Sequence, residues 1–215
     1  MKPIKKIYEE YNIISGLQQH QLRVAAVAWQ ICDSLAVKVD MESIIKACLL
    51  HDMGNIIKSD LSFFPDFVQK EGIDYWQNVK EQFIGKYGTD EHEATRQIVE
   101  ELGMHQKVIT IIQAIGFRNA VSNEKSKNLE IKVCVYADMR VGPHGVLSLD
   151  ARLDEGEKRY NGNRKWVYER AGYDRAVKSL HTIEKQIFQL SEINPGEVSD
   201  LSIEQYLEKL QDYQI

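Results

Sequence analysis

Residues 41–55 read Met-Glu-Ser-Ile-Ile-Lys-Ala-Cys-Leu-Leu-His-Asp-Met-Gly-Asn, and this stretch decides the fold. Apolar residues dominate it as far as Leu50, which predicts a buried helix. Gly54 is a helix-stop signal, and the pair His51-Asp52 stands just before it. An imidazole and a carboxylate are therefore expected at the end of a buried helix, where side chains can swing free of the helix surface.

Two further segments carry a polar residue on an apolar background. His20 lies on a helically spaced apolar stripe within residues 17–31, so its side chain is expected to face inward. Asp138 lies in the apolar run 129–141. Alternating residues make a strand possible in that run, but the neighbouring apolar residues favour a buried helix.

Four residues are therefore candidate ligands of one divalent metal ion: His20, His51, Asp52 and Asp138. Adjacent residues on a helix point about 100° apart, so the His-Asp pair can share an ion only at a helix edge. Three helices converging in a bundle core provide that arrangement. Ordinary core roles are the alternative, but they would bury two imidazoles and two carboxylates without partners.

The ligand types indicate the chemistry but leave the ion open. Imidazole and carboxylate suit Mn, Fe, Co, Ni, Zn and Mg. An ion held this way lowers the pKa of a bound water and supplies hydroxide near neutral pH. The expected cofactor is thus a divalent metal ion of unknown identity, and the expected chemistry is that of a metal-dependent hydrolase.

The rest of the chain has mostly helical periodicity. Residues 58–73 and 122–128 are expected to be loops, and Gly142-Pro143 breaks the chain after Asp138. The predicted helical segments lie at about 75–84, 90–102, 105–116, 149–191 and 201–210. The simplest interpretation is one all-α domain, in which residues 1–147 form a helical bundle and residues 148–215 a helical C-terminal extension packing on it.

Composition limits the partners and the location. The chain has 215 residues, is 43% hydrophobic and carries a net charge of −5, so no broad basic surface for duplex nucleic acid is expected. No segment approaches the ~18 apolar residues of a membrane span. The three cysteines are far apart and odd in number, which fits buried reduced thiols. These features predict a cytoplasmic protein that does not bind a membrane.

Three short motifs resemble the HD-domain metal-dependent phosphohydrolase superfamily. They are His20-Gln21-Leu22-Arg23-Val24, Leu49-Leu50-His51-Asp52-Met53-Gly54-Asn55 and Ala137-Asp138. The resemblance covers roughly residues 15–145 and implies an HD-domain helical bundle. It also implies that His20, His51, Asp52 and Asp138 hold the metal, that Asp52 positions the attacking water, and that the substrate is a small phosphorylated molecule such as a nucleotide.

The resemblance gives His92 a special position. Some members of the superfamily have additional histidines between the His-Asp pair and the last aspartate, and these hold a second ion. His92 lies in that interval, but the expected later histidine is missing from Ile115-Gly116-Phe117-Arg118. This departure counts against a full two-metal site, and hence against a cyclic-dinucleotide phosphodiesterase or a di-iron oxygenase. His92 is either a catalytic residue that moves a proton or binds a second ion, or a solvated first-turn residue.

Three polar residues near the motifs are candidate substrate ligands. Arg23 is one turn beyond His20, and its guanidinium suits phosphate, although a surface salt bridge is the alternative. Lys58 follows the His-Asp turn and has the same two interpretations. Asn55 either caps that turn or binds the substrate.

The aromatic residues after the turn have two possible roles. They could form a lid that stacks on a base, although an apolar stripe packed on the bundle is the commoner meaning. These residues are Phe63, Phe64, Phe67, Tyr75 and Trp76.

Two classes of function follow. The first is a metal-dependent phosphohydrolase that cleaves a phosphomonoester or phosphoanhydride of a nucleotide or related metabolite. The second is a non-catalytic HD module that senses a nucleotide, and redox chemistry at a di-iron site is a weaker third. The C-terminal helices could dock on the core, cover the site or build a homodimer.

Overall fold

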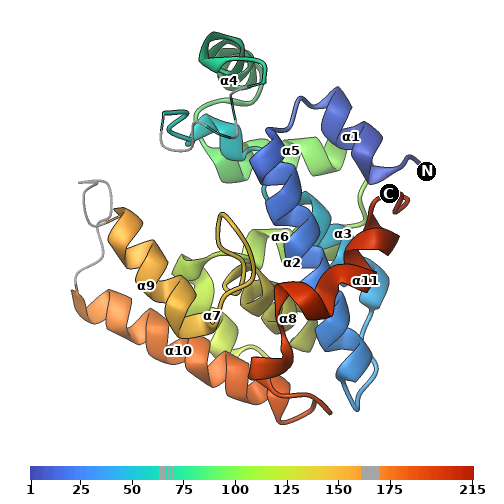
Figure 1. Ribbon diagram of the computed structural model, residues 1–215, viewed down its shortest axis with the longest axis vertical. Coiled ribbons are helices and arrows are strands. Elements are labelled where there is room, and N and C mark those ends of the chain that lie inside the picture. The colour runs from blue at the N-terminus through green and yellow to red at the C-terminus, as the bar shows by residue number, and fades with distance from the viewer. Residues whose placement is uncertain (63–65, 67, 69, 161–169) are drawn as a thin grey trace.

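The computed structural model describes residues 1–62, 66, 68, 70–160 and 170–215, and their regular structure is helical (Figure 1). The described α-helices are α1 (Ile4–Glu10), α2 (Ser15–Ser34), α3 (Met41–Leu50), α4 (Ile73–Tyr87), α5 (Glu91–Glu101), α6 (Gln106–Ala114), α7 (Ala120–Lys125), α8 (Leu129–Asp138), α9 (Leu149–Tyr160), α10 (Arg170–Phe188) and α11 (Asp200–Leu210). Short 3-10 helices are η1 (Asn55–Ile57), η3 (Phe117–Asn119) and η4 (Pro195–Glu197). No β-strand occurs among the described residues, which confirms the all-α prediction.

Helices α2, α3 and α8 pack against one another and form the centre of the fold. Their facing sides are fully buried, because small and branched apolar side chains line them at helical spacing. Capping fixes where two of them begin: Asp40 accepts a hydrogen bond from Ser43 N at the start of α3, and Asn128 accepts one from Ile131 N at the start of α8. The sequence therefore determines both the pairing faces and the register of the helices that carry the candidate ligands.

The three cysteines lie in this central packing. Cys32 comes from α2, Cys48 from α3 and Cys134 from α8, and all three are buried free thiols. Burial raises the pKa of the Cys32 and Cys134 thiols well above the usual value. A protonated thiol is a poor nucleophile, so these two side chains act as small apolar packing groups.

The C-terminal helices pack directly on this bundle. Helix α11 packs along α2, and α10 packs along α7 and α8. The two chain termini lie side by side in Figure 1, where Lys2 N donates to Ile215 O and Ile215 N donates to Lys2 O, both at 3.0 Å.

A buried arginine ties the C-terminal segment to α8. Arg140 is 2% exposed, and its guanidinium donates to the carbonyl oxygens of Leu147, Pro195 and Val198. It also donates to the Tyr136 hydroxyl at 2.6 Å, which in turn donates to Glu184 on α10 at 2.6 Å. One side chain thus joins α8, the loop that follows it and the segment before α11.

Two predictions about local structure are corrected or resolved. Residues 122–128 were expected to be a polar loop, but Ala120–Lys125 form α7. The helix forms because tertiary contacts support it: Asn123 Nδ2 donates to Ala114 O of α6 at 2.8 Å, and α7 packs on α10. In the run 129–141 the helix interpretation is confirmed by α8, and the strand alternative is wrong.

The aromatic residues after the His-Asp turn are only partly described. Trp76 is 5% exposed and packs in the core, whereas Tyr75 is 43% exposed and lies edge-on to it. Phe63, Phe64 and Phe67 lie outside the described residues, as does the stretch 161–169 within the predicted helical segment. The stripe interpretation is therefore confirmed for Trp76.

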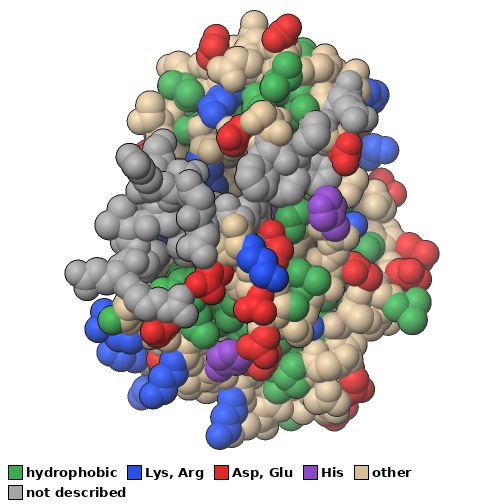
Figure 2. Space-filling model, turned by 60° about the vertical axis from the view of Figure 1, so that its left-hand side comes forward, with side chains coloured by type: hydrophobic (Ala, Val, Ile, Leu, Met, Phe, Trp, Pro, Cys, Tyr) green, Lys and Arg blue, Asp and Glu red, His purple; other side chains and the backbone are tan. Residues whose placement is uncertain are grey.

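Two surface properties bear on possible partners. Across the described residues, no helix combines the length and the apolarity that crossing a membrane requires. On the face drawn in Figure 2, Asp and Glu side chains gather in the centre and at the right, and Lys and Arg side chains gather mainly at the lower left.

Candidate metal centre

The four predicted ligands converge from three helices. His20 lies on α2, His51 is the C-cap of α3 and is followed by Asp52, and Asp138 is the last residue of α8. Because α2, α3 and α8 pack together, their side chains meet although up to 118 positions separate them in the sequence. The prediction that His51 and Asp52 would reach one point from a helix end is confirmed.

The distances between the candidate ligand atoms are short. Asp138 Oδ1 lies 3.2 Å from His20 Nε2 and 3.5 Å from His51 Nε2. Asp52 Oδ2 lies 3.8 Å from His20 Nε2 and 3.7 Å from His51 Nε2. The atoms of His20, His51 and Asp52 are all within 4.8 Å of one another. Two imidazole nitrogens and two carboxylate oxygens therefore surround one small volume.

This spacing suits a divalent ion. Bonds of 2.0–2.2 Å place neighbouring ligand atoms about 2.8 to 3.6 Å apart, close to the separations in the cluster. His51 Nε2 is buried and makes no hydrogen bond, since 3.5 Å to Asp138 Oδ1 is too long for a good one. A buried nitrogen without a partner, facing two carboxylates, fits a metal ligand. The residues present thus match the group that the motifs imply.

The electrostatics favour a cation at the same point. Burial alone would lower the pKa of His51, but the carboxylates of Asp52 and Asp138 raise that pKa to about 10. Burial would raise the pKa of Asp138, but the two imidazoles hold it well below the usual value. The pocket therefore stabilises positive charge at the imidazoles, and a divalent ion supplies that charge more fully than a proton.

The ring of His51 is held by its own helix. Its Nδ1 lies 2.8 Å from Cys48 O, which accepts the Nδ1 proton. This hydrogen bond fixes the tautomer and directs Nε2 toward the carboxylates, as is typical of metal-binding histidines. The His51 side chain is 3% exposed, so the ring has little freedom to turn away.

The turn after the His-Asp pair packs tightly on α5. Gly54 N donates to Thr95 Oγ1 at 2.9 Å. A Cβ at Gly54 would lie 2.4 Å from Glu91 O, 2.8 Å from the Ala94 Cβ and 2.8 Å from Thr95 N. Two of these three neighbours are backbone atoms, so nothing can move aside without displacing the helix.

The substitution Gly54→Ala is therefore expected to push α5 away from the turn that carries Asp52. Overpacking of this kind costs about 1–3 kcal/mol, which lowers the melting temperature by several degrees. The melting temperature and the Mn²⁺ affinity should both fall. Gly85→Ala should keep the Mn²⁺ affinity and should not lower the melting temperature, because a Cβ there meets open space and alanine favours the helix. A Gly54→Ala protein as stable as the wild type would show that this contact is looser than described.

His92 lies on the first turn of α5 beside the turn of the His-Asp pair. Its side chain is 44% exposed, and Nε2 is 3.5 Å from Glu91 Oε1. Lys58 Nζ is 3.4 Å from the same oxygen, so Glu91 joins the two predicted residues. Burial, together with the charges of Arg118 and Lys58, lowers the pKa of His92. His92 is thus outside the four-residue cluster and belongs to a neighbouring group of polar residues.

That neighbouring group contains a residue that sequence reasoning did not propose. Arg118 lies in η3 and is exposed, and its charge acts on His92. One feature of the sequence could have pointed to Arg118: it lies in the segment where a further histidine was expected. Tertiary structure was needed to show that the chain returns to α5 at this point.

The other two predicted substrate ligands are less free than expected. Arg23 Nε lies 3.8 Å from Asp200 Oδ1, at the start of α11, and its side chain is 23% exposed. Asn55 is 9% exposed and begins η1, where its N–H donates to Asp52 O at 3.0 Å. The salt-bridge alternative for Arg23 therefore describes a contact that is present, whereas the contact of Asn55 is made by its backbone, so the capping role of its side chain stays a prediction.

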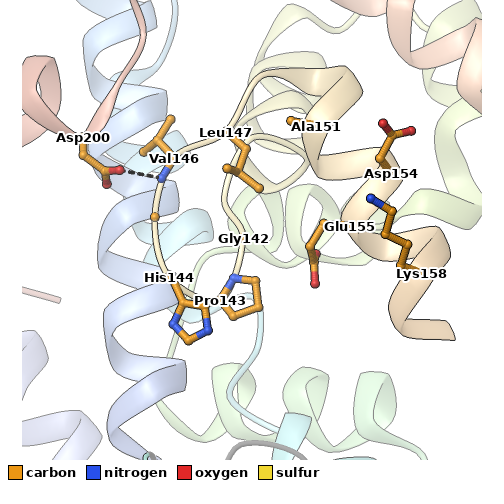
Figure 3. A pocket seen from close by; sticks show the side chains of 11 residues that line it. Gly142, Pro143, His144, Val146, Leu147, Ala151, Asp154, Glu155, Lys158 and Asp200 are labelled. Atoms are coloured by element: carbon orange, nitrogen blue, oxygen red, sulfur yellow. Dashed lines mark hydrogen bonds between the residues drawn. The ribbon is translucent and has the colours of Figure 1, made fainter.

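A cavity of about 780 Å³ opens beside Asp200 (Figure 3). Its walls are the loop 142–147 and one side of α9, and Val146 N donates to Asp200 Oδ2 at 3.0 Å. His144 also lines this cavity. Asp200 thus connects the cavity wall with Arg23, one turn from His20.

Comparison with known families agrees with the all-α fold. The structure is an all-α bundle in which two imidazoles and two carboxylates from three helices converge on a possible metal site. The chain matches the family model named HD domain over residues 17–138, which is more than half of its length. The protein therefore belongs to the HD-domain superfamily of metal-dependent phosphohydrolases. Comparisons with curated proteins and with solved structures find no match.

Proposed function

We propose that this protein is a metal-dependent phosphohydrolase that cleaves a phosphomonoester or phosphoanhydride of a nucleotide or related small metabolite. The observation that supports this most is the cluster of two imidazole nitrogens and two carboxylate oxygens at 3.2–3.8 Å. His20, His51, Asp52 and Asp138 would hold the ion. When bound, a divalent ion supplies a water of lowered pKa and neutralises charge on a phosphate.

The exposure of the ligands assigns them different tasks. The side chains of His51 and Asp138 are 3% and 12% exposed, so they form the closed side of the site. The side chains of His20 and Asp52 are 17% and 20% exposed and form the more open side. Asp52 is the carboxylate on that side, so it is the proposed ligand that also accepts a hydrogen bond from the attacking water and orients it.

His92 is the proposed acceptor of the proton that the attacking water loses. Its lowered pKa keeps the ring neutral at neutral pH, and a neutral imidazole can accept a proton. Its partial exposure lets the proton pass on to solvent.

Lys58 and Arg118 are the proposed phosphate-binding side chains. Both act electrostatically on His92, so they place positive charge at the same side of the His-Asp turn. Guanidinium and ammonium groups recognise phosphate oxygens by charge-assisted hydrogen bonds. Arg23 lies on α2 and pairs with Asp200. It would contact the substrate only if its guanidinium left Asp200 and bound a phosphate group. Asn55 would contribute mainly through the shape of the turn.

A product-detection experiment tests this function. The protein, stripped with chelator and then reloaded with Mn²⁺, is incubated with nucleotides and sugar phosphates, and products are identified by mass spectrometry. We expect turnover of at least one phosphate ester by the reloaded protein and loss of that turnover in the stripped sample. Turnover that survives stripping would contradict a metal-dependent mechanism. A nucleotide that raises the melting temperature but is never consumed would identify a sensing module instead.

A further inference from the structure

Gln21 is a polar residue in an otherwise apolar part of the bundle. It follows His20 on α2 and is 0% exposed. Its side-chain Oε1 accepts a hydrogen bond from the backbone N–H of Asp52 at 3.2 Å. One amide therefore links the helix that carries His20 to the backbone of the His-Asp pair.

The hydrogen bonding at the end of α3 explains why Asp52 N is available. In a continuing helix this N–H would donate to the carbonyl of Cys48, four residues earlier. Here Cys48 O accepts from His51 Nδ1 at 2.8 Å, and the helix ends at His51. Asp52 N donates instead to Gln21 Oε1. A side chain of α2 thus takes the place of Cys48 O, which already accepts from the His51 ring.

The second atom of the amide makes no such contact. Gln21 Nε2 is buried and has no hydrogen-bond partner. The assignment of the two amide atoms follows from Asp52 N, which is a donor and must face the oxygen. A buried donor without a partner is unfavourable, and a Leu or Met at this position would avoid that penalty. The hydrogen bond from Asp52 N to Gln21 Oε1 therefore explains the amide at this position, whereas packing alone does not.

We propose that Gln21 is a positioning residue for the metal centre. By holding Asp52 N, it fixes the backbone between His51 and Asp52 so that Nε2 and Oδ2 face the same point. It does so from the position next to His20, which ties the ligands of two helices into one unit. The inference rests on the proposed function, because it assumes that the four residues bind a metal ion.

The test compares Mn²⁺ affinity by calorimetry in the full chain for wild type, Gln21→Met and Gln21→Glu. Met fills the space but accepts no hydrogen bond, so Mn²⁺ should bind about 10- to 100-fold more weakly, as expected when a residue that orients metal ligands is removed. Glu keeps an oxygen within reach of Asp52 N and should restore most of the affinity. A melting curve without metal shows whether each variant is folded.

Gln30→Met is the matched control. Gln30 is on the same helix, and its amide bonds to Glu197 O and Ser202 Oγ, away from the metal centre. This variant should keep wild-type Mn²⁺ affinity, and equal weakening in Gln21→Met and Gln30→Met would overturn the inference. Should Gln21→Met fail to fold, Gln21→Asn replaces it, because the shorter amide cannot reach Asp52 N.

The outcomes separate the two proposals. Wild-type protein that binds no Mn²⁺ defeats the proposed function and this inference together. Wild-type binding with unchanged affinity in folded Gln21→Met or Gln21→Asn overturns the inference and leaves the function standing. Loss in Met and Asn with recovery in Glu supports the positioning role.

Discussion

Asp52→Ala is expected to abolish hydrolysis and to weaken metal binding more than any other single change. The substitution removes one of the four candidate ligands, the one with the most exposed side chain. Without the ion, an attacking water keeps a pKa of about 15.7 instead of about 7, so we expect activity to fall on the order of 10³-fold or more. The rate of product formation with Mn²⁺ present, together with Mn²⁺ affinity, measures both effects.

Two variants control this prediction. Asp74→Ala removes an exposed carboxylate in the first turn of α4 and should behave as wild type in both assays. Asp52→Asn keeps the shape of the side chain but removes its charge, and it should be nearly as inactive as the alanine variant. Activity in Asp52→Ala within tenfold of wild type would show that Asp52 neither holds the ion nor orients the water.

Arg140→Met is expected to have the largest effect on stability. It removes the donor that three backbone carbonyls and the Tyr136 hydroxyl share, and leaves these buried or partly buried acceptors without it. Loss of a buried, charged hydrogen-bonding centre costs about 3–5 kcal/mol. For a chain of this size that corresponds to a fall in melting temperature of about 6–20 °C.

The measurement is calorimetric or optical thermal unfolding of the metal-free protein. Arg175→Met is the control, because Arg175 is an exposed arginine on α10. The control should melt within about 2 °C of wild type, as is usual for surface changes within ±0.5 kcal/mol. A similarly small shift for Arg140→Met would mean that the C-terminal segment is held mainly by the packing of α11 on α2.

The fold and the convergence of the four candidate ligands were predictable because their signals are local. Apolar spacing identified the helices, and His51-Asp52 before Gly54 marked a helix end. The strand alternative at residues 129–141 remained open because a short apolar run fits either structure. Only the packing of α8 against α2 and α3 decides between them. Helix α7 was missed because its polar residues find acceptors outside the segment, such as Ala114 O for Asn123.

The surroundings of the site needed tertiary structure. No residue near Arg23 in the sequence predicts its contact with Asp200, which lies 177 positions later. The two side chains are close only because α11 packs along α2. Arg118 approaches His92 through the same kind of long-range contact. Gln21 carries no sequence signal either, since a glutamine beside an apolar stripe usually faces solvent. The contacts around the candidate site are thus set by packing, whereas the candidate metal ligands follow from the motifs.

A crystal of the wild-type protein grown with Mn²⁺ tests the central claim most directly. Anomalous scattering locates the ion without assuming any ligand. The account predicts one strong peak per chain, about 2.0–2.3 Å from His20 Nε2, His51 Nε2 and carboxylate oxygens of Asp52 and Asp138. A protein that is folded and saturated with Mn²⁺ yet shows no peak among these four residues, or a peak only elsewhere, would contradict it.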